Sequence, residues 1–518
     1  MRRGAVFAIE TEDNLKNFTS RKEGSMTVDP TIVIERLESG IPLFTDLPQP
    51  GQVKSPRIIG LESELSEWDP GMGRDHGATG HSPYIGHNQY KWFPCGGQVY
   101  RDQPKQVLEI CTPETSNPVE AAVRMEMLRR KVAAEYSASE GAGGISLYDT
   151  STDWGMSSTN SLGNHESYSG SVSKISGASA LGPLAPYLVA RIIFTGTGYV
   201  DGNGMFEISP RARFMKAFMS EETTTPERPL INTREFRNRA DDEKNWRLHF
   251  ICGESNRNQI ASLLKVGFMS LAIDMLEEGC LPRFPFEERT IADDMEHVSK
   301  HSSGWIQNGI KNASDKWHMP SIIGGRYSAL DLMNVWQEKA SEVFSGRDEI
   351  TDTILVLMRY VLDKLDDPEK NLGALSRVLD WSAKLGMSLL SKQEGDGYST
   401  PHALDMEYHL LGSESLSTYL QSHHLASVLV PEKVISGSAG FPPQDTRACF
   451  RGWLVTRLAR EKSHYFDGSG SLHLIWNDCL VRRDGRDNAC HFRIEDPFQT
   501  YHEHRESVEN FLTSKYIT

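Results

Sequence analysis

Carboxylates recur at every second position in two short segments of the chain. In "RIIGLESEL", Glu62 and Glu64 alternate with apolar residues, and in "QVYRD", Tyr100 and Asp102 have the same spacing. Alternate residues of a β-strand point to the same face of a sheet, so each segment predicts a strand with one apolar face and one ionisable face. Because Mg²⁺ prefers oxygen ligands such as carboxylates, the pattern indicates a sheet face that could hold metal ions.

Basic residues follow the same spacing farther along the chain. In "NWRLHFIC", Arg247 and His249 alternate with apolar residues, and in "FEISPR" a predicted strand face carries Glu207, Ser209 and Arg211. Arginine forks match phosphate oxygens, and Mg²⁺ sites usually combine a few carboxylates with substrate phosphates. A face that carries both kinds of residue therefore predicts a site for metal ions and a polyphosphate.

Each of these residues also has a structural interpretation. A Glu-x-Glu pair on a strand is usually solvated surface, and Asp102 could order a turn or form a salt bridge. His165, in "GNHESY", could be a loop or core histidine, and Arg234, in "INTR", a surface or helix-capping residue. The sequence contains no Walker loop, GxSxG or HExxH motif, so no single motif decides between the interpretations.

Composition narrows the class of protein. The 518 residues include 70 acidic and 55 basic ones, a net charge of −15, which argues against a nucleic-acid-binding protein. No stretch reaches the roughly 18 apolar residues of a membrane-spanning helix, and the run "GAVFAI" ends at Glu10, too short for a secretory signal. The seven cysteines contain no CxxC pair and suggest reduced thiols. We expect a cytoplasmic protein with no membrane and no nucleic-acid partner.

The predicted elements give an α+β fold with an antiparallel sheet. Strands are predicted at 57–65, as a pair within 96–114, and at 245–252 and 471–484; helices are predicted at 115–136, up to Glu278, and over most of 328–392. We expect three parts: a poorly ordered extension at 1–55 with one short helix at 30–39, a large domain at 56–439 that carries the ionisable sheet face, and a small C-terminal domain at 440–518.

The order of the motifs resembles the family of Pup ligases and depupylases. The resemblance covers roughly Arg57 to Phe498, and its most specific parts are "RPLINTRE" and "RLHFICGESN" followed by "LLKVG". Enzymes of this family act on a prokaryotic ubiquitin-like protein and are related to glutamine synthetase and glutamate–cysteine ligase. The resemblance therefore implies a glutamine synthetase-like fold, with a curved antiparallel sheet and backing helices, whose large domain at 56–439 binds ATP and Mg²⁺.

The resemblance also implies roles for the residues that match the family's motifs. Residues that match metal ligands, or lie beside the metals, are Glu62, Tyr100, Glu109 and His165, and His165 could contact the nucleotide instead. Asp102 matches the catalytic carboxylate. The residues expected at the nucleotide are Arg211 and Arg234, which match phosphate contacts, and Arg247 and His249, assigned from their shared strand face.

The chain departs from the family pattern around the acceptor. Ser167 and Glu254 replace an Asn and an Asp of the family's motifs, and a segment rich in Gly and His occupies 69–90. We expect a ligase that activates a carboxylate as an acyl phosphate and forms an amide or isopeptide bond, on a Pup-like protein or a small acid that differs from the standard substrate. Three alternatives stay open: a depupylase-like amidase, a phosphotransferase for a small molecule, and a non-catalytic nucleotide-binding regulator. The oligomeric state is not indicated.

Overall fold

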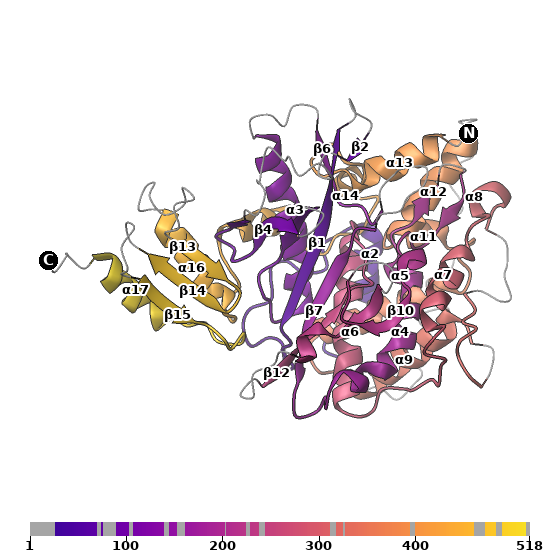
Figure 1. Cartoon of the computed structure of the whole chain (residues 1–518). Helices are drawn as coiled ribbons and strands as arrows, with labels where there is room; N and C mark the ends of the chain where they lie inside the picture. Colours follow the sequence, from indigo (N-terminus) through magenta and orange to yellow (C-terminus); the bar gives the residue numbers. More distant parts are fainter. Residues whose placement is uncertain are drawn as a thin grey trace.

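The computed structural model describes residues 26–69, 74–75, 90–102, 107–138, 145–152, 161–201, 204–223, 228–237, 244–310, 317–324, 327–393, 399–459, 472–482 and 489–513. Most of the Gly- and His-rich segment lies outside these residues. A ten-stranded sheet forms the centre of the molecule, with a layer of helices against one face (Figure 1). Among the described residues, the helical layer therefore covers one of the two faces of the sheet.

The strands of the sheet come from distant parts of the chain. In spatial order they are β10 (Ala217–Ser220), β11 (Pro229–Asn232), β12 (Asn245–Phe250), β7 (Asn164–Ser171), β1 (Ile59–Asp69), β5 (Val107–Cys111), β4 (Gln98–Asp102) and β3 (Tyr90–Trp92). Short strands β2 (Arg74–Asp75) and β6 (Ser146–Tyr148) pair with the end of β1, and β8 (Tyr199–Val200) pairs with β9 (Phe206–Glu207). Along the main order every pair is antiparallel except β10 with β11, which is parallel.

Helices α3 (Pro118–Ser137) and α6 (Gln259–Glu277) pack on the covered face. As predicted, α3 begins after Asn117, whose side chain accepts a hydrogen bond from the Glu120 backbone N–H at 2.8 Å. The Glu120 carboxylate pairs with Arg124 instead of completing a capping box. Helix α6 is long and apolar enough to span a membrane, but 89% of its apolar 18-residue stretch is buried inside the protein. Its composition is therefore that of a core helix.

The remaining helices form the rest of the layer and the C-terminal part. They are α4 (Ala185–Ala190), α5 (Ile192–Thr195), α7 (Ile291–Lys300), α8 (Trp305–Asn308), α9 (Ala329–Phe344), α10 (Glu349–Leu365), α11 (Leu372–Ser376), α12 (Asp380–Gln393), α13 (Ser399–His409), α14 (Leu416–Ser422), α15 (Glu432–Gly437), α16 (Ala448–Ala459) and α17 (His504–Thr513). The mostly helical stretch predicted at 328–392 corresponds to α9 through α12.

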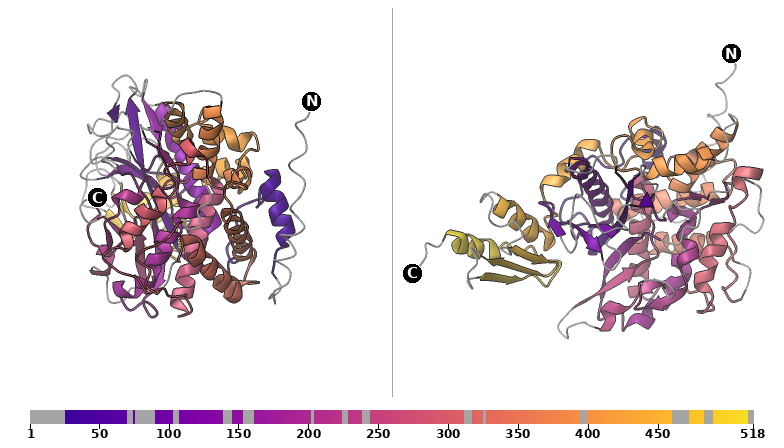
Figure 2. Two further views of the ribbon diagram at one scale, coloured as in Figure 1. Left: turned by 90° about the vertical axis from the view of Figure 1, so that its right-hand side faces the viewer. Right: turned by 45° about the horizontal axis from the view of Figure 1, so that its top comes forward.

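The N-terminal segment differs from the predicted poorly ordered extension. Helix α2 (Pro30–Ser39) has the predicted bounds, with Asp29 as its N-cap. Its residues Val33 and Leu37 are buried in the main core, and the backbone and hydroxyl of Thr27 both donate to Asp352. In Figure 2 the helix lies outside the helical layer, on the side away from the sheet. The apolar side chains of α2 and the hydrogen bonds of Thr27 therefore attach this segment to the main body. Residues 1–25 lie outside the described residues.

The C-terminal part has a hydrophobic core of its own. Strands β13 (Leu472–Ile475), β14 (Asp478–Arg482) and β15 (Ala489–Arg493) form an antiparallel sheet beside α16 and α17, and the unit projects to one side of the main body (Figure 1). Trp92, on β3 of the main sheet, is buried in this second core. The separate core supports the predicted small domain from about residue 440, although the domain bounds stay a prediction.

Glu114 joins the two cores. Its carboxylate lies 2.6 Å from Arg447 Nε and accepts a bidentate hydrogen bond from Arg451, and both arginines belong to the C-terminal part. Burial alone would raise the pKa of Glu114, but the charges of Arg451 and Arg447 outweigh it and lower the pKa to about 2. The Glu114 carboxylate therefore links the main body to the C-terminal part through ion pairs, and it is not part of a sheet-face site.

Replacing Glu114 should destabilise the protein strongly. Glu114→Gln leaves buried Arg451 and partly buried Arg447 without their carboxylate, and removing one partner of a buried pair typically costs about 3–5 kcal/mol. We expect that loss in the free energy of unfolding at pH 7, measured by urea denaturation. Because the folded-state pKa is depressed, the difference from wild type should be full above the ordinary pKa of Glu and should shrink as the pH falls toward about 2.

The matched control is Glu342→Gln, which breaks a surface ion pair with Lys339 whose Glu is 69% exposed. This variant should lose less than about 1 kcal/mol. Equal losses in the two variants would show that the Glu114 contacts do not hold the parts together.

Candidate active site

Strand pairing gathers the predicted site residues on one face of the sheet. Glu62 on β1 is paired in register with His165 on β7, and the neighbouring position of β7, Ser167, is paired with His249 on β12. On the other side of β1, Glu64 is paired with Glu109 on β5, which is paired in turn with Tyr100 on β4. Cross-strand partners project to the same face, so five strands contribute to one surface.

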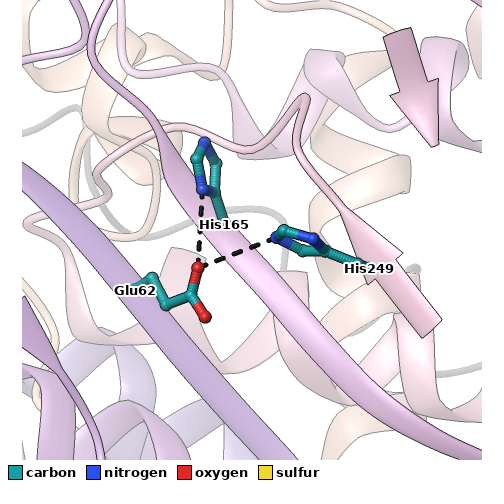
Figure 3. A group of neighbouring side chains, drawn as sticks. All are labelled: Glu62, His165 and His249. Atoms are coloured by element: carbon teal, nitrogen blue, oxygen red, sulfur yellow. Dashed lines mark ion pairs between the residues drawn. The ribbon is translucent and has the colours of Figure 1, made fainter. Parts of the chain in front are cut away.

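Glu62, His165 and His249 form the centre of this surface (Figure 3). One carboxylate oxygen of Glu62 lies 3.6 Å from His165 Nδ1 and 3.7 Å from His249 Nε2. The three possible ligand atoms all lie within 4.8 Å of one another. A carboxylate and two imidazoles at this spacing can hold a divalent cation.

The charges around Glu62 favour its ionised form. Its other oxygen accepts a hydrogen bond from Arg247 Nη2 at 2.5 Å. Burial would raise the pKa of Glu62, but Arg247 and the two histidines hold it below its ordinary value. Burial lowers the pKa of His249 well below its ordinary value, and Arg247 adds to this effect. The neutral imidazole keeps a ring nitrogen, Nε2, without a hydrogen-bond partner, which is the form that binds metals.

Glu109 lies close to several other carboxylates of the sheet face. Burial and the like charges of Glu62, Glu64 and Asp102 raise its pKa well above the ordinary value. Tyr100, next to it across the ladder, also has a raised pKa, because of burial and its anionic neighbours. A divalent cation among these carboxylates would reverse the repulsion, so the residues present fit the Mg²⁺ predicted from the sequence.

Arg211 lies on a loop beside the acidic side chains of the sheet face. Its guanidinium is buried and lies 3.5 Å from His165 Nε2, and it donates to the Ile251 carbonyl and to the Ser161 hydroxyl. Gly163 permits this approach, because a Cβ there would lie 2.2 Å from His165 Nε2 and 2.9 Å from Arg211 Nη2. Burial lowers the pKa of Arg211 to about 10.

Glu254 holds the loop that carries Arg211. Its two oxygens accept hydrogen bonds from the backbone N–H groups of Thr197 and Arg211 and from the hydroxyls of Thr197 and Ser209. The carboxylate is buried, and burial raises its pKa against the effect of these hydrogen bonds. The position singled out as a departure from the family pattern thus fixes the backbone of a predicted phosphate contact.

One prediction about this site is wrong. Strand β9 ends at Glu207, so Glu207, Ser209 and Arg211 do not share a strand face; the chain turns there into a 3₁₀ helix, η3 (Ala212–Phe214). Arg234 is exposed, on the 3₁₀ helix η4 (Arg234–Arg237), and its Nη2 donates to the Glu221 carbonyl at 3.1 Å. Its charge adds to the effect of burial and of Arg247 in lowering the pKa of His249, and its role as a phosphate contact stays a prediction.

Other residues of the surface were not among the predicted ligands. Glu64 accepts a hydrogen bond from the Gly163 N–H and lies among the acids. Buried Cys111 is paired with Glu62 across the ladder. Arg228, just before β11, lies near Arg211 and Glu64. The alternation along β1 already indicated that Glu64 lies on the same face as Glu62. The positions of Cys111 and Arg228 on this face follow only from the pairing of distant strands, which the sequence does not show.

Comparisons with known proteins agree with this geometry. A family model described as "Pup-ligase protein" matches residues 59–467. A depupylase of Acidothermus cellulolyticus is 32% identical over 384 residues, which cover 71% of this chain and 72% of that protein. A Pup–protein ligase of Nakamurella multipartita is 31% identical over 385 residues, covering 70% of this chain and 76% of the ligase.

Solved structures show the same fold. The complex between the prokaryotic ubiquitin-like protein Pup and its ligase PafA has a TM-score of 0.73 at 20% identity and covers 90% of this chain and 94% of that one. PafA in complex with ADP has a TM-score of 0.67 at 21% identity, covering 82% and 91%. The α+β fold with a curved antiparallel sheet and backing helices, of the glutamine synthetase-like type, is thereby confirmed.

Removing the second imidazole should weaken binding of a divalent cation. We expect His249→Ala to raise the dissociation constant for Mn²⁺ at least about tenfold, or about 1.4 kcal/mol, because His249 offers a neutral, unbonded ring nitrogen next to Glu62. Isothermal titration calorimetry measures the constant. His502→Ala, at an exposed surface histidine, is the control and should match wild type. An unchanged constant in His249→Ala would remove His249 from the metal site.

Proposed function

The chain belongs to the Pup-ligase family, and we propose that it uses ATP and Mg²⁺ to activate a carboxylate for amide or isopeptide bond formation. The observation that carries the proposal is the joint placement of Glu62, His165 and His249 beside buried arginines on one sheet face. Cation ligands next to phosphate-binding groups are what phosphoryl transfer requires, because its catalysis is mainly positioning and charge stabilisation.

Each part of the surface has a role in this proposal. Glu62, His165 and His249 hold a divalent cation, and the neighbouring carboxylates Glu64 and Glu109, with Tyr100 beside them, hold further Mg²⁺. When bound, the cations neutralise phosphate charge and polarise the transferred phosphoryl group. Arg247 keeps Glu62 ionised and oriented through its hydrogen bond. This assignment moves His249 from the nucleotide, where the sequence had placed it, to the metal.

The reaction then has two steps. A carboxylate oxygen of the donor attacks the terminal phosphorus of ATP, which gives an acyl phosphate and ADP. An amine attacks the acyl carbon, Asp102 accepts the proton released by the amine, and inorganic phosphate leaves. Arg211 stabilises the charge on the transferred group from the other side of the site. Activation is needed because a carboxylate is a poor electrophile.

A Pup-like protein is the donor that we propose. Relatives carry the names Pup–protein ligase and depupylase, and PafA has been solved with Pup. The departure at Ser167 and the Gly- and His-rich segment at 69–90 support a donor that differs from the standard one, and a small acid is the alternative. All seven cysteines are free thiols, which fits the cytoplasmic location that stays a prediction.

A second activity is favoured by one of the comparisons. The relative that is 32% identical is named depupylase. On the same surface, a water in place of the amine would give amide hydrolysis, with Asp102 accepting a proton from the water. Phosphoryl transfer to a small molecule as an end product would use the same nucleotide site without the second step.

Product analysis tests the proposal. The protein is incubated with ATP, Mg²⁺, a standard Pup and a panel of acids and amines, and products are identified by mass spectrometry. A ligase gives a conjugate lighter than its two parts by one water, with ADP and phosphate in equal amounts. Cleavage of an existing amide identifies the amidase, and a phosphorylated small molecule identifies the phosphotransferase. Absence of all three products would contradict an enzymatic function.

Asp102 should act in turnover and not in nucleotide binding. It shares a strand face with Tyr100 and lies close enough to raise the pKa of Glu109. Asp102→Asn keeps the size of the side chain and removes its basicity. We expect ATP affinity to change by less than about tenfold, or about 1.4 kcal/mol, while turnover falls on the order of a hundredfold, the scale for a lost general base.

The control for this variant is Asp293→Asn, at an exposed position of α7, which should turn over normally. Normal turnover of Asp102→Asn would make Asp102 structural. A parallel loss of affinity and turnover would make it a metal ligand.

A further inference from the structure

Lys265 is a buried lysine whose ammonium group lies between two segments of the candidate active site. It belongs to α6, which packs on the covered face of the sheet, and it is only 2% exposed. Its Nζ donates to the Asn164 side-chain oxygen and to the Glu254 carbonyl, both at 2.6 Å. Because side chains alternate along β7, Asn164 points to the covered face and its neighbour His165 to the site face. Lys265 therefore contacts the strand of a candidate metal ligand from behind.

Packing and ion pairing do not explain the charge of Lys265. Both of its hydrogen-bond acceptors are neutral oxygens, and among the described residues no carboxylate forms an ion pair with it. Burial lowers the pKa of Lys265 to about 8, and the charges of Glu166 and Asp149 offset this effect only in part. A buried charge without a directly bound counterion costs stability, so a lysine at this position indicates a role other than stabilising the core.

The two segments that Lys265 contacts also meet directly. The Asn164 backbone N–H donates to the Gly253 carbonyl at 3.2 Å. A Cβ at Gly253 would lie 2.3 Å from the Asn164 carbonyl oxygen, so a glycine is needed for the two chains to lie this close. The ammonium group adds a second link between the same two segments, made from the helix that packs behind them.

From these two segments the contacts continue to the site. The Glu254 carboxylate accepts a hydrogen bond from the Arg211 backbone N–H at 3.1 Å. Arg211 Nη2 in turn lies 3.5 Å from His165 Nε2. One route therefore runs from Lys265 through Asn164 to His165, and the other runs through Glu254 to Arg211.

We propose that Lys265 is a positioning residue that sets the distance and orientation between His165 and Arg211. It acts through Asn164 on one side and through Glu254 on the other, from the face of the sheet opposite the candidate metal ligands. Its effect on turnover rests on the proposed function, whereas its effect on cation binding does not. Misplacement of an active-site group by about 1 Å can cost about a hundredfold in rate.

The first test is Lys265→Met, which keeps an unbranched side chain and removes the donors. We expect kcat to fall at least about tenfold, and the dissociation constant for Mn²⁺, measured by calorimetry, to rise at least about threefold. The electron paramagnetic resonance spectrum of the bound Mn²⁺ reports the geometry of its ligands and should differ from that of wild type. Circular dichroism and urea denaturation check that the variant is folded under the assay conditions.

The control is Lys392→Met. This variant also removes a hydrogen bond from an ammonium group to a backbone carbonyl, that of Ile306, but away from the site surface. Its kcat, Mn²⁺ affinity and Mn²⁺ spectrum should match those of wild type.

A double-mutant cycle tests the route through Asn164. Asn164→Ala removes one of the two acceptors and should lower kcat by itself, so it carries the test if Lys265→Met does not fold. The variant with both changes should lose no more kcat than Lys265→Met alone, because both changes break the same link.

Unchanged kcat, Mn²⁺ affinity and Mn²⁺ spectrum in folded Lys265→Met would overturn the proposal, as would unchanged values in Asn164→Ala. Losses in kcat that multiply in the double variant would also overturn it, because they would show that Lys265 and Asn164 act independently. Absence of turnover in the wild-type protein would instead refute the proposed function. The Mn²⁺ measurements would then still decide whether Lys265 positions the site.

Discussion

The hydrogen-bonded ladder through β1 holds acidic side chains closer together than their charges favour. Glu62 and Glu64 are two residues apart on one strand, and the pairing of Glu64 with Glu109 adds a third carboxylate beside them. Like charges directly opposite each other destabilise a sheet, and burial together with these like charges raises the pKa of Glu109 well above its ordinary value. The sheet must therefore be stabilised elsewhere, and the site depends on that support.

The covered face supplies the support. It carries apolar side chains that pack on α3 and α6, and its charges are matched: Glu166 forms two hydrogen bonds with Arg191, at 2.6 and 3.0 Å. Lys265 of α6 donates to the Asn164 side chain and to the Glu254 carbonyl, both at 2.6 Å. Buried pairs of this kind contribute little net stability but are costly to break. They fix β7 and the segment of Glu254, and with them His165 and Arg211.

Much of the site could be predicted from patterns within single strands. The remaining contacts depend on which distant strands pair, and a sequence does not show this directly. Period-two alternation placed Glu62 with Glu64 and Arg247 with His249 on common faces, because that period is readable within one strand. Placing Glu62 and His165 together at the metal needed the resemblance to a known family, and the position of His249 beside them was not predicted. Arg228 was not predicted, since its place on the face depends on β11 pairing with β12.

Trp92 gives the molecule a particular order of assembly. It lies on β3, the last strand at one edge of the main sheet, and its indole N–H donates to the Leu474 carbonyl at 3.3 Å while its ring meets Trp476 edge-on. Its buried partners all come from residues 450–512. During synthesis the chain can complete the other strands of the sheet before those residues leave the ribosome. The indole of Trp92, on the strand that pairs with Tyr100, is therefore buried in the second core only after nearly the whole chain has been made.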